Sequence, residues 1–204
     1  MKSACASIRE SIRWLPNEPS EPTDTIVLTG LHSGIFVDVR FEKEGHSLDW
    51  AFAGYRSSDG PVTIFKHCID SRTLNPLDVV DQGTNKTLPS GTIVESGEMI
   101  NPSTSLMTSY EEVWRDEEHD TGIFMRNSTS SEWRAMVGCH QLALGRTNDH
   151  FWAWQAVKGA DGWKLQHSFG FDGRTTLLPD HHLDWATQQN IMLWDGDLWS
   201  VFYG

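Results

Sequence analysis

The sequence predicts an all-β protein built from two tandem antiparallel β-barrel domains, and two observations predict it. When the chain of 204 residues is shifted by 102 positions, residues 50–78 align with residues 152–180 without a gap and share eight identities, where about two are expected by chance. Short runs of alternating apolar and polar residues are separated by turns that contain glycine, a pattern typical of sandwiches and barrels. We therefore expect an internal duplication, with domains at residues 1–104 and 105–204.

The aligned segments have the features of a β-hairpin. In the first, the turn Asp59-Gly60 separates two strand-like runs, and Asp161-Gly162 occupies the same place in the second. Tryptophan followed by an Asp-Gly turn also recurs in β-rich proteins that are not duplicated, and this is the alternative explanation of the similarity.

The strands of the N-terminal half are expected from alternation of apolar residues with period two. The clearest run is residues 35–41, in which Ile35, Val37 and Val39 share one face while Asp38 and Arg40 share the other. In chain order, the expected strands cover residues 8–15, 25–29, 35–41, 48–52, 62–72, 92–98 and 108–115. The polar segment 17–22, with two prolines, is expected to be extended and to separate the first two.

The C-terminal half repeats this scheme. Runs rich in aromatic and β-branched residues are separated by turns such as that at Asp161-Gly162. In chain order, the expected strands cover residues 132–144, 151–157, 164–171, 191–194 and 198–202. Little helix is expected anywhere in the chain.

Composition excludes several classes of function. A net charge of −12 disfavours nucleic acid as a partner, because binding to the phosphate backbone requires a basic surface. The first sixteen residues lack the apolar run of a secretory signal, and no window is apolar enough for a membrane span. Three cysteines, an odd and sparse set, suit a reducing compartment. We therefore expect a cytoplasmic protein with no membrane partner.

No catalytic or cofactor motif is recognisable. The chain has no nucleophile elbow, phosphate-binding loop, dinucleotide fingerprint or zinc-finger spacing, so we expect no cofactor. His181 and His182 are adjacent, and no acidic or thiol partner lies at ligand spacing from them. Adjacent side chains on a strand point to opposite faces, so we expect no metal site.

A small-molecule pocket is predicted from the aromatic content. Ten tryptophans exceed the usual proportion, and indoles are favoured both in β-barrel cores and in pockets for flat apolar ligands, two uses that stay open here. Strand alternation places polar residues beside aromatic ones, which gives a cup in which ionisable groups have shifted pKa values. The candidate catalytic residues are Arg40, His67, Tyr110 and Glu112, and the candidate substrate-binding residues are Trp50, Phe52, Phe65 and Trp114.

Several long motifs give the chain a family resemblance. They are SIRWLP at residues 11–16, TDTIVLT at 23–29, FVDVR at 36–40, LDWAFAG at 48–54 and YEEVWRD at 110–116. The chain resembles the fungal Hri-type proteins, named for interaction with a casein-kinase-type protein kinase, over about residues 8–116. The resemblance implies an intracellular fungal protein with two tandem calycin-like, lipocalin-like β-barrels, and it implies a protein kinase as a partner.

Related small fungal proteins of this kind are hetero-Diels–Alderases of tropolone sesquiterpenoid pathways, in which a quinone methide formed from a hydroxymethyl tropolone or phenol adds to a humulene-type terpene. The chain is similar to them in size and aromatic content. We therefore expect a cofactor-independent pericyclase of fungal secondary metabolism that binds apolar and aromatic substrates. The alternatives are a lipocalin-like small-molecule carrier, a protein-kinase interaction protein, and an isomerase or dehydratase using the same cup. Whether the chain forms a homodimer stays open.

Overall fold

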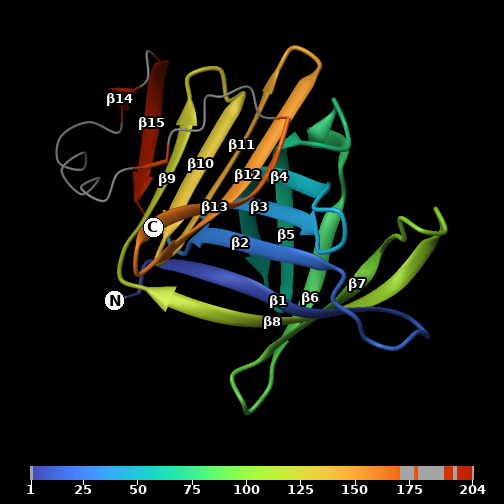
Figure 1. The fold of residues 1–204 in the computed structure, drawn as a ribbon. Helices are drawn as coiled ribbons and strands as arrows, with labels where there is room; N and C mark the ends of the chain where they lie inside the picture. The colour runs from blue at the N-terminus through green and yellow to red at the C-terminus, as the bar shows by residue number, and fades with distance from the viewer. Residues whose placement is uncertain (1, 171–176, 179–190, 195–196, 204) are drawn as a thin grey trace.

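The computed structural model of the chain describes residues 2–170, 177–178, 191–194 and 197–203 (Figure 1). Within these residues the chain is almost entirely β, and no described helix is long enough to span a membrane. The elements are β1 (Ala4–Trp14), β2 (Thr23–Gly30), β3 (Ile35–Glu42), β4 (Leu48–Asp59), β5 (Val62–Asp70), the short 3-10 helix η1 (Pro76–Asp78), β6 (Asp81–Thr87), β7 (Ile93–Ile100), β8 (Met107–His119), β9 (Gly122–Asn127), β10 (Glu132–Val137), β11 (His140–Thr147), β12 (His150–Gly159), β13 (Gly162–Phe169), β14 (Ile191–Trp194) and β15 (Asp197–Tyr203).

The first eight strands form a closed antiparallel barrel. Each strand pairs with the next in the chain, and β8 closes the barrel by pairing with β1. The barrel therefore continues to His119, beyond the boundary expected between residues 104 and 105, because β8 pairs with both β7 and β1. The sequence did not predict β6, whose residues are mostly polar and show no alternation of apolar side chains.

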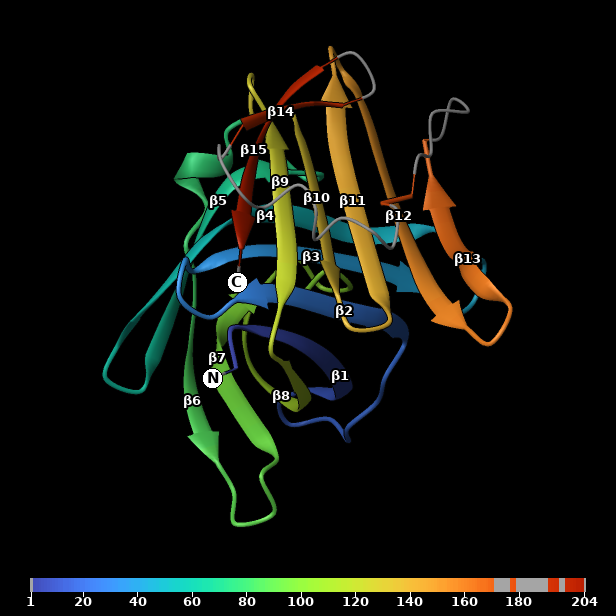
Figure 2. The same ribbon diagram turned by 90° about the vertical axis from the view of Figure 1, so that its left-hand side faces the viewer.

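The remaining strands form a second sheet in the order β13-β12-β11-β10-β9-β15-β14. Figure 2 shows β9 to β12 of this sheet side by side. Over the described residues this sheet is open, so the expected second barrel is corrected to one barrel and one sheet. The single strand expected at 132–144 is the hairpin β10–β11, because Gly138 adopts a φ of 57° that turns the chain. The sequence also did not predict β9.

The two aligned segments form hairpins at matching positions. The segment around Asp59-Gly60 is the β4–β5 hairpin, and that around Asp161-Gly162 is the β12–β13 hairpin. Gly60 and Gly162 both have positive φ, which explains why glycine recurs there. Outside these segments, β1 and β8 pair with each other. The internal duplication stays a prediction.

The largest apolar core lies between the barrel and the second sheet. Along β3, Ile35, Val37 and Val39 face outward from the barrel into this core. The sheet contributes Phe124, Trp133, Ala135, Val137, Leu142, Leu144, Phe151 and Ala153. Figure 1 shows the strands of the sheet standing against β2 and β3. The alternate residues of β3 therefore face the barrel interior, which leaves that interior for other chemistry.

Candidate functional site

Seven of the eight predicted site residues line one cavity inside the barrel. They are Arg40, Trp50, Phe52, Phe65, Tyr110, Glu112 and Trp114, and the lining is completed by Val27, Asp38, Asp81, Glu95 and Met99. The cavity has a volume of about 30 Å³, which is the space of roughly one water molecule. We call it the inner cavity. It admits one small polar group and no ring.

A larger space, the mouth cavity, adjoins it. The mouth cavity has a volume of about 350 Å³, at the lower end of the range for ligand pockets, roughly 300–1,000 Å³. Arg40, Trp50 and Met99 line both cavities and stand between them. The other lining residues are Arg9, Ile12, Trp14, Pro22, Thr23, Glu42, Asp49, Arg72, Pro102 and Ser103. The mouth cavity is thus lined by aromatic and aliphatic side chains together with charged groups.

Arg40 lies at the junction of the two cavities. Its Nη2 donates to Asp38 Oδ2 at 2.7 Å, and its Nη1 lies 3.6 Å from Glu112 Oε1. The guanidinium carbon is 5.0 Å from the centre of the Trp50 ring and 5.4 Å from that of Phe52. Burial acts to lower the pKa of Arg40, but Asp38 and Glu112 outweigh it and raise that pKa well above its ordinary value. Arg40 is therefore a permanent cation.

Glu112 on β8 is held between two guanidinium groups. Arg9 donates to it through Nη1, and Arg40 approaches it from β3. Arg9 also bonds to Glu21 through Nε at 2.9 Å and to Thr23 through Nη2 at 2.6 Å. Glu112 thus has the partners of an ionised carboxylate, which anchors the two arginines.

Glu95 on β7 is in the opposite situation. It faces Glu112 directly across the β7–β8 pair, and like charges at such positions repel. Tyr110 Oη donates to Glu95 Oε1 at 3.0 Å. Burial and the charge of Glu112 raise the pKa of Glu95 to about 8, and burial beside Glu95 raises the pKa of Tyr110. At neutral pH Glu95 is therefore a carboxylic acid with a proton to donate.

Two glycines make room for this pair. A Cβ on Gly83 would lie 2.5 Å from the Glu95 side chain, and one on Gly97 would lie 2.9 Å from the Tyr110 ring. Both glycines are on neighbouring strands, β6 and β7, and Gly97 pairs with Tyr110. Any larger residue at these positions displaces Glu95 or Tyr110.

His67, the eighth predicted residue, lies in the wall and does not line the cavity. It is fully buried and stacks on Phe52 with ring centres 4.2 Å apart. Its Nδ1 is 2.7 Å from Asp70 Oδ2 and its Nε2 is 3.0 Å from Asp81 Oδ2. Burial acts to lower the pKa of His67, but these hydrogen bonds prevail and raise it. With both nitrogens engaged, His67 holds Phe52 and the two aspartates in place.

Asp70 fixes the Trp50 wall. It accepts a hydrogen bond of 2.9 Å from Trp50 Nε1 and one of 2.7 Å from the backbone N–H of Arg72. The Arg72 guanidinium lies 4.5 Å from the Trp50 ring, on the mouth side. Burial acts to raise the pKa of Asp70, but its bonds to His67, Arg72 and Trp50 lower it overall. The Trp50 ring is therefore held in one orientation.

The charged groups of this site that the sequence did not predict include Arg9, Asp38, Asp81 and Glu95. For Asp38 a signal was available, because it shares a strand face with Arg40. Arg9 precedes a bulge between Arg9 and Ser11 that shifts the pairing of β1 with β8, so alternation does not give its orientation.

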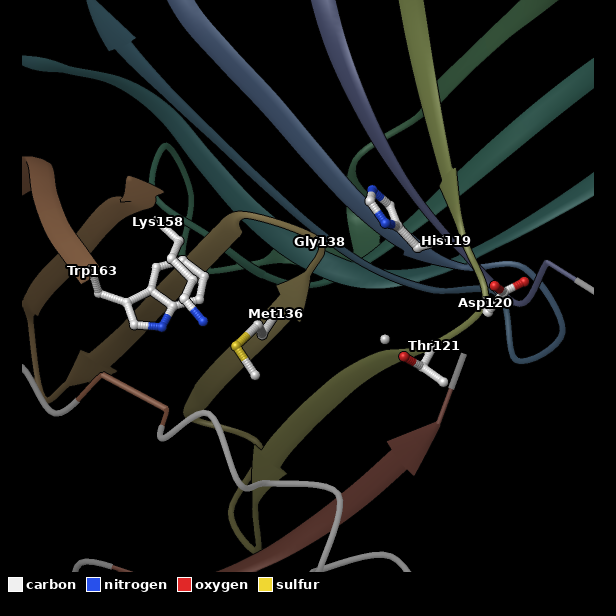
Figure 3. Close-up of a pocket in the computed structure, with 8 residues that line it drawn as sticks. His119, Asp120, Thr121, Met136, Gly138, Lys158 and Trp163 are labelled. Carbon is white, nitrogen blue, oxygen red and sulfur yellow. The ribbon is translucent and has the colours of Figure 1, made fainter. Parts of the chain in front are cut away.

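A second hollow lies where β8 runs into β9. It has a volume of about 370 Å³ and is lined by His119, Asp120, Thr121, Gly122, Met136, Gly138, Lys158 and Trp163 (Figure 3). None of the predicted site residues is among them. In the described part of the chain no group of histidine, cysteine, aspartate or glutamate side chains is arranged to hold a metal ion. His181 and His182 lie outside the described residues.

Comparison with known proteins gives one family. The family model described as Protein HRI1 matches residues 5–202, which is nearly the whole chain. Comparisons with curated proteins and with solved structures gave no significant match.

Proposed function

The chain belongs to the HRI1 protein family, and on that premise we propose that its N-terminal barrel is a cofactor-independent pericyclase. The proposed reaction is an intermolecular hetero-Diels–Alder addition of a tropolone or phenol quinone methide to a humulene-type terpene, in the cytoplasm and in fungal secondary metabolism. We also propose that the two halves arose by duplication and that the barrel is related to the calycins.

The observation that carries the proposal is an acid beside an aromatic wall. Glu95 lines the inner cavity together with Trp50 and Trp114, and its pKa of about 8 keeps it protonated at neutral pH. A buried carboxylic acid next to a pocket for flat ligands is the arrangement that general acid catalysis requires.

The first step would be loss of water from the hydroxymethyl group. The bound ring lies in the mouth cavity against Trp50, and Glu95 donates its proton to the leaving hydroxyl as the C–O bond breaks. The O–H bond of the ring enol breaks, its electron pair forms the C=O bond, and the ring π electrons shift to form the exocyclic C=C bond. The enol proton replaces the one that Glu95 gave, so the net change is loss of one water with no oxidation or reduction. Arg40, at the junction of the cavities, stabilises negative charge that develops on that oxygen.

The second step would be the cycloaddition. The enone of the quinone methide and the alkene of the terpene form one C–C bond and one C–O bond, with no proton or electron exchanged. The protein contributes by holding both partners in one orientation, which replaces the entropy cost of a bimolecular encounter. Trp14, Ile12 and Met99 give the mouth cavity apolar surface for the terpene.

A specific observation also favours an interaction protein. The end of β8 and the residues after it carry Asp116, Glu117, Glu118 and Asp120, three of them exposed and Glu117 half-buried. Such an acidic segment is complementary to a basic partner, and the predicted protein kinase stays a proposal for it. A lipocalin-like carrier would use the mouth cavity without turnover.

The test is to incubate the purified protein with a hydroxymethyl tropolone and humulene, followed by chiral chromatography. The proposal predicts faster, stereochemically enriched adduct, and loss of most of this rate in Glu95→Gln, which cannot donate a proton. Glu98→Gln is the matched control, because Glu98 lies on the same strand and is exposed. Racemic adduct at the rate without protein, together with retained binding of the tropolone, would instead support the carrier.

A further inference from the structure

The indole N–H of Trp114 lacks a hydrogen-bond partner within the described part of the chain. Trp114 lies on β8, is 7% exposed and lines the inner cavity. Its Nε1 is buried, and no hydrogen-bond partner is present among the described residues. A buried donor left without an acceptor costs on the order of one hydrogen bond. An acceptor atom of a bound ligand in the inner cavity would remove this cost.

The other polar groups of the inner cavity have partners. Arg40 donates to Asp38, Glu112 accepts from Arg9, and Tyr110 donates to Glu95. Asp81 lies 3.0 Å from the ring of His67. The Trp114 N–H is therefore a fixed donor that the described residues of this cavity leave without an acceptor. It is a donor, so its complement is an acceptor.

Size and charge define that acceptor further. A volume of about 30 Å³ holds one oxygen atom with its immediate substituent and excludes a ring. The cavity is lined by three carboxylates, Asp38, Asp81 and Glu112, and by one guanidinium, Arg40, which already pairs with Asp38 and Glu112. A full negative charge would therefore meet net negative charge, whereas a neutral oxygen would not be repelled. The neighbouring acid Glu95 offers a second donor while it is protonated.

We infer that the inner cavity is a subsite for one neutral carbonyl oxygen of an aromatic ligand, bound by the Trp114 N–H while the ring lies in the mouth cavity against Trp50. This rests on the proposed function in taking the mouth cavity as the ligand site, and it adds the substrate class: planar ketones and enolones, in preference to hydrocarbons of the same shape. Trp114 is then a specificity-determining residue.

Binding of tropone, a neutral ring with a single carbonyl oxygen, tests the inference without any turnover. Trp114→Phe keeps an aromatic ring and removes the N–H, and we expect it to weaken tropone binding about tenfold. Toluene, which has no acceptor, should bind both proteins equally. Trp154→Phe is the matched control, because Trp154 is 1% exposed and its Nε1 also lacks a partner among the described residues, but it lies in the second sheet.

A second variant keeps the result interpretable if Trp114→Phe fails to fold. Glu95→Gln keeps an N–H donor at position 95 at every pH, so the affinity of this variant for tropone should stay constant between pH 6 and 9. The affinity of the wild-type protein should fall severalfold over the same range as Glu95 ionises.

Three results would overturn the inference: no tropone binding to the wild-type protein, equal tropone binding to wild type and folded Trp114→Phe, or equal losses for tropone and toluene. A protein that binds tropone through Trp114 but forms no cycloadduct would leave this subsite intact and remove the proposed reaction alone.

Discussion

The two faces of β3 show how the barrel divides stability from chemistry. Val37 and Val39 point outward into the apolar core shared with the second sheet. Asp38 and Arg40, their neighbours in the chain, point inward to a network of ion pairs. A strand buried on both faces is here apolar on one face and charged on the other.

The difference assigns different physical roles to the two regions. Burial of apolar area at the outer core is favourable without directional partners, at roughly 25 cal/mol per Å². Buried ion pairs gain little net stability, because desolvation offsets most of their attraction. The outer core therefore stabilises the fold, and the barrel interior, which contributes less to stability, is the region to which we assign the proposed binding and catalysis.

The largest effect should come from placing an interior residue type on the outer face. Val37→Asp would bury an unpaired carboxylate among apolar side chains, and we expect it to lower the free energy of unfolding by about 4 kcal/mol or more. Chemical denaturation with Val37→Ala as the control measures this. A loss below about 1 kcal/mol would show that the outer core is not the main source of stability.

An effect nearly as large should follow from breaking the interior network. Arg40→Met leaves Asp38 without its main partner and should cost about 3 kcal/mol of unfolding free energy. The double variant Asp38→Leu/Arg40→Met should recover to within about 1 kcal/mol of wild type, yet have no catalytic activity. If the double variant is no more stable than Arg40→Met, the ion pair contributes net stability after all.

Titration of Glu95 should distinguish the two regions by pH. The folded protein raises its pKa from 4.5 to about 8, so the folded state binds this proton more tightly than the unfolded state. The stability that this tighter proton binding gives the folded state is fully present below pH 4.5 and is lost as the pH rises toward 8. Glu95→Gln does not titrate, so its unfolding free energy should rise relative to that of wild type as the pH increases from 5 to 9. We expect a gain on the order of 2 kcal/mol, because water entering the cavity screens part of the pKa shift of Glu95. Thermal unfolding across this range, with Glu98→Gln as control, provides the measurement, and identical pH profiles for wild type and Glu95→Gln would contradict it.

The smallest effect is expected on the solvent-exposed outer surface of the barrel. Arg13 pairs with Glu111 on the neighbouring strand β8, with side chains 38% and 36% exposed. Because solvent screens such a pair, Arg13→Ala should change the unfolding free energy by at most about 0.5 kcal/mol. Arg9→Ala, on the same strand but inside the barrel, should cost several times more in the same denaturation experiment.

Alternation made the barrel and its lining predictable from sequence. Alternation over residues 35–41 and at Trp50 and Phe52 places Arg40, Trp50 and Phe52 on the inner face, whereas a bulge in the β3–β4 pairing puts Leu48 against the outer core. On β8, Tyr110, Glu112 and Trp114 follow the same rule. Local pattern was sufficient there because each strand has one face in the outer core or in solvent and one in the interior.

Alternation could not predict what depends on pairing between distant strands. The barrel closes through β8 and β1, over a hundred residues apart, so the expected boundary at residue 104 fell before its last strand. Pairing between distant strands also determines the state of Glu95, whose pKa is raised by its burial and by Glu112, which lies opposite it across the β7–β8 pair. His67 was predicted as catalytic from its residue type, whereas Asp70 and Asp81 hold it in the wall.

NMR of the tryptophan indole N–H groups can locate the ligand and so test whether the barrel interior binds it. On addition of tropolone, we expect the signals of Trp50 and Trp114, which line the inner cavity, to shift progressively. The signals of Trp133 and Trp154, buried in the outer core and the second sheet, should stay in place. Assignment by single Trp→Phe variants makes the pattern unambiguous. Shifts confined to Trp133 and Trp154, or no shift at saturating tropolone, would contradict a ligand site inside the N-terminal barrel.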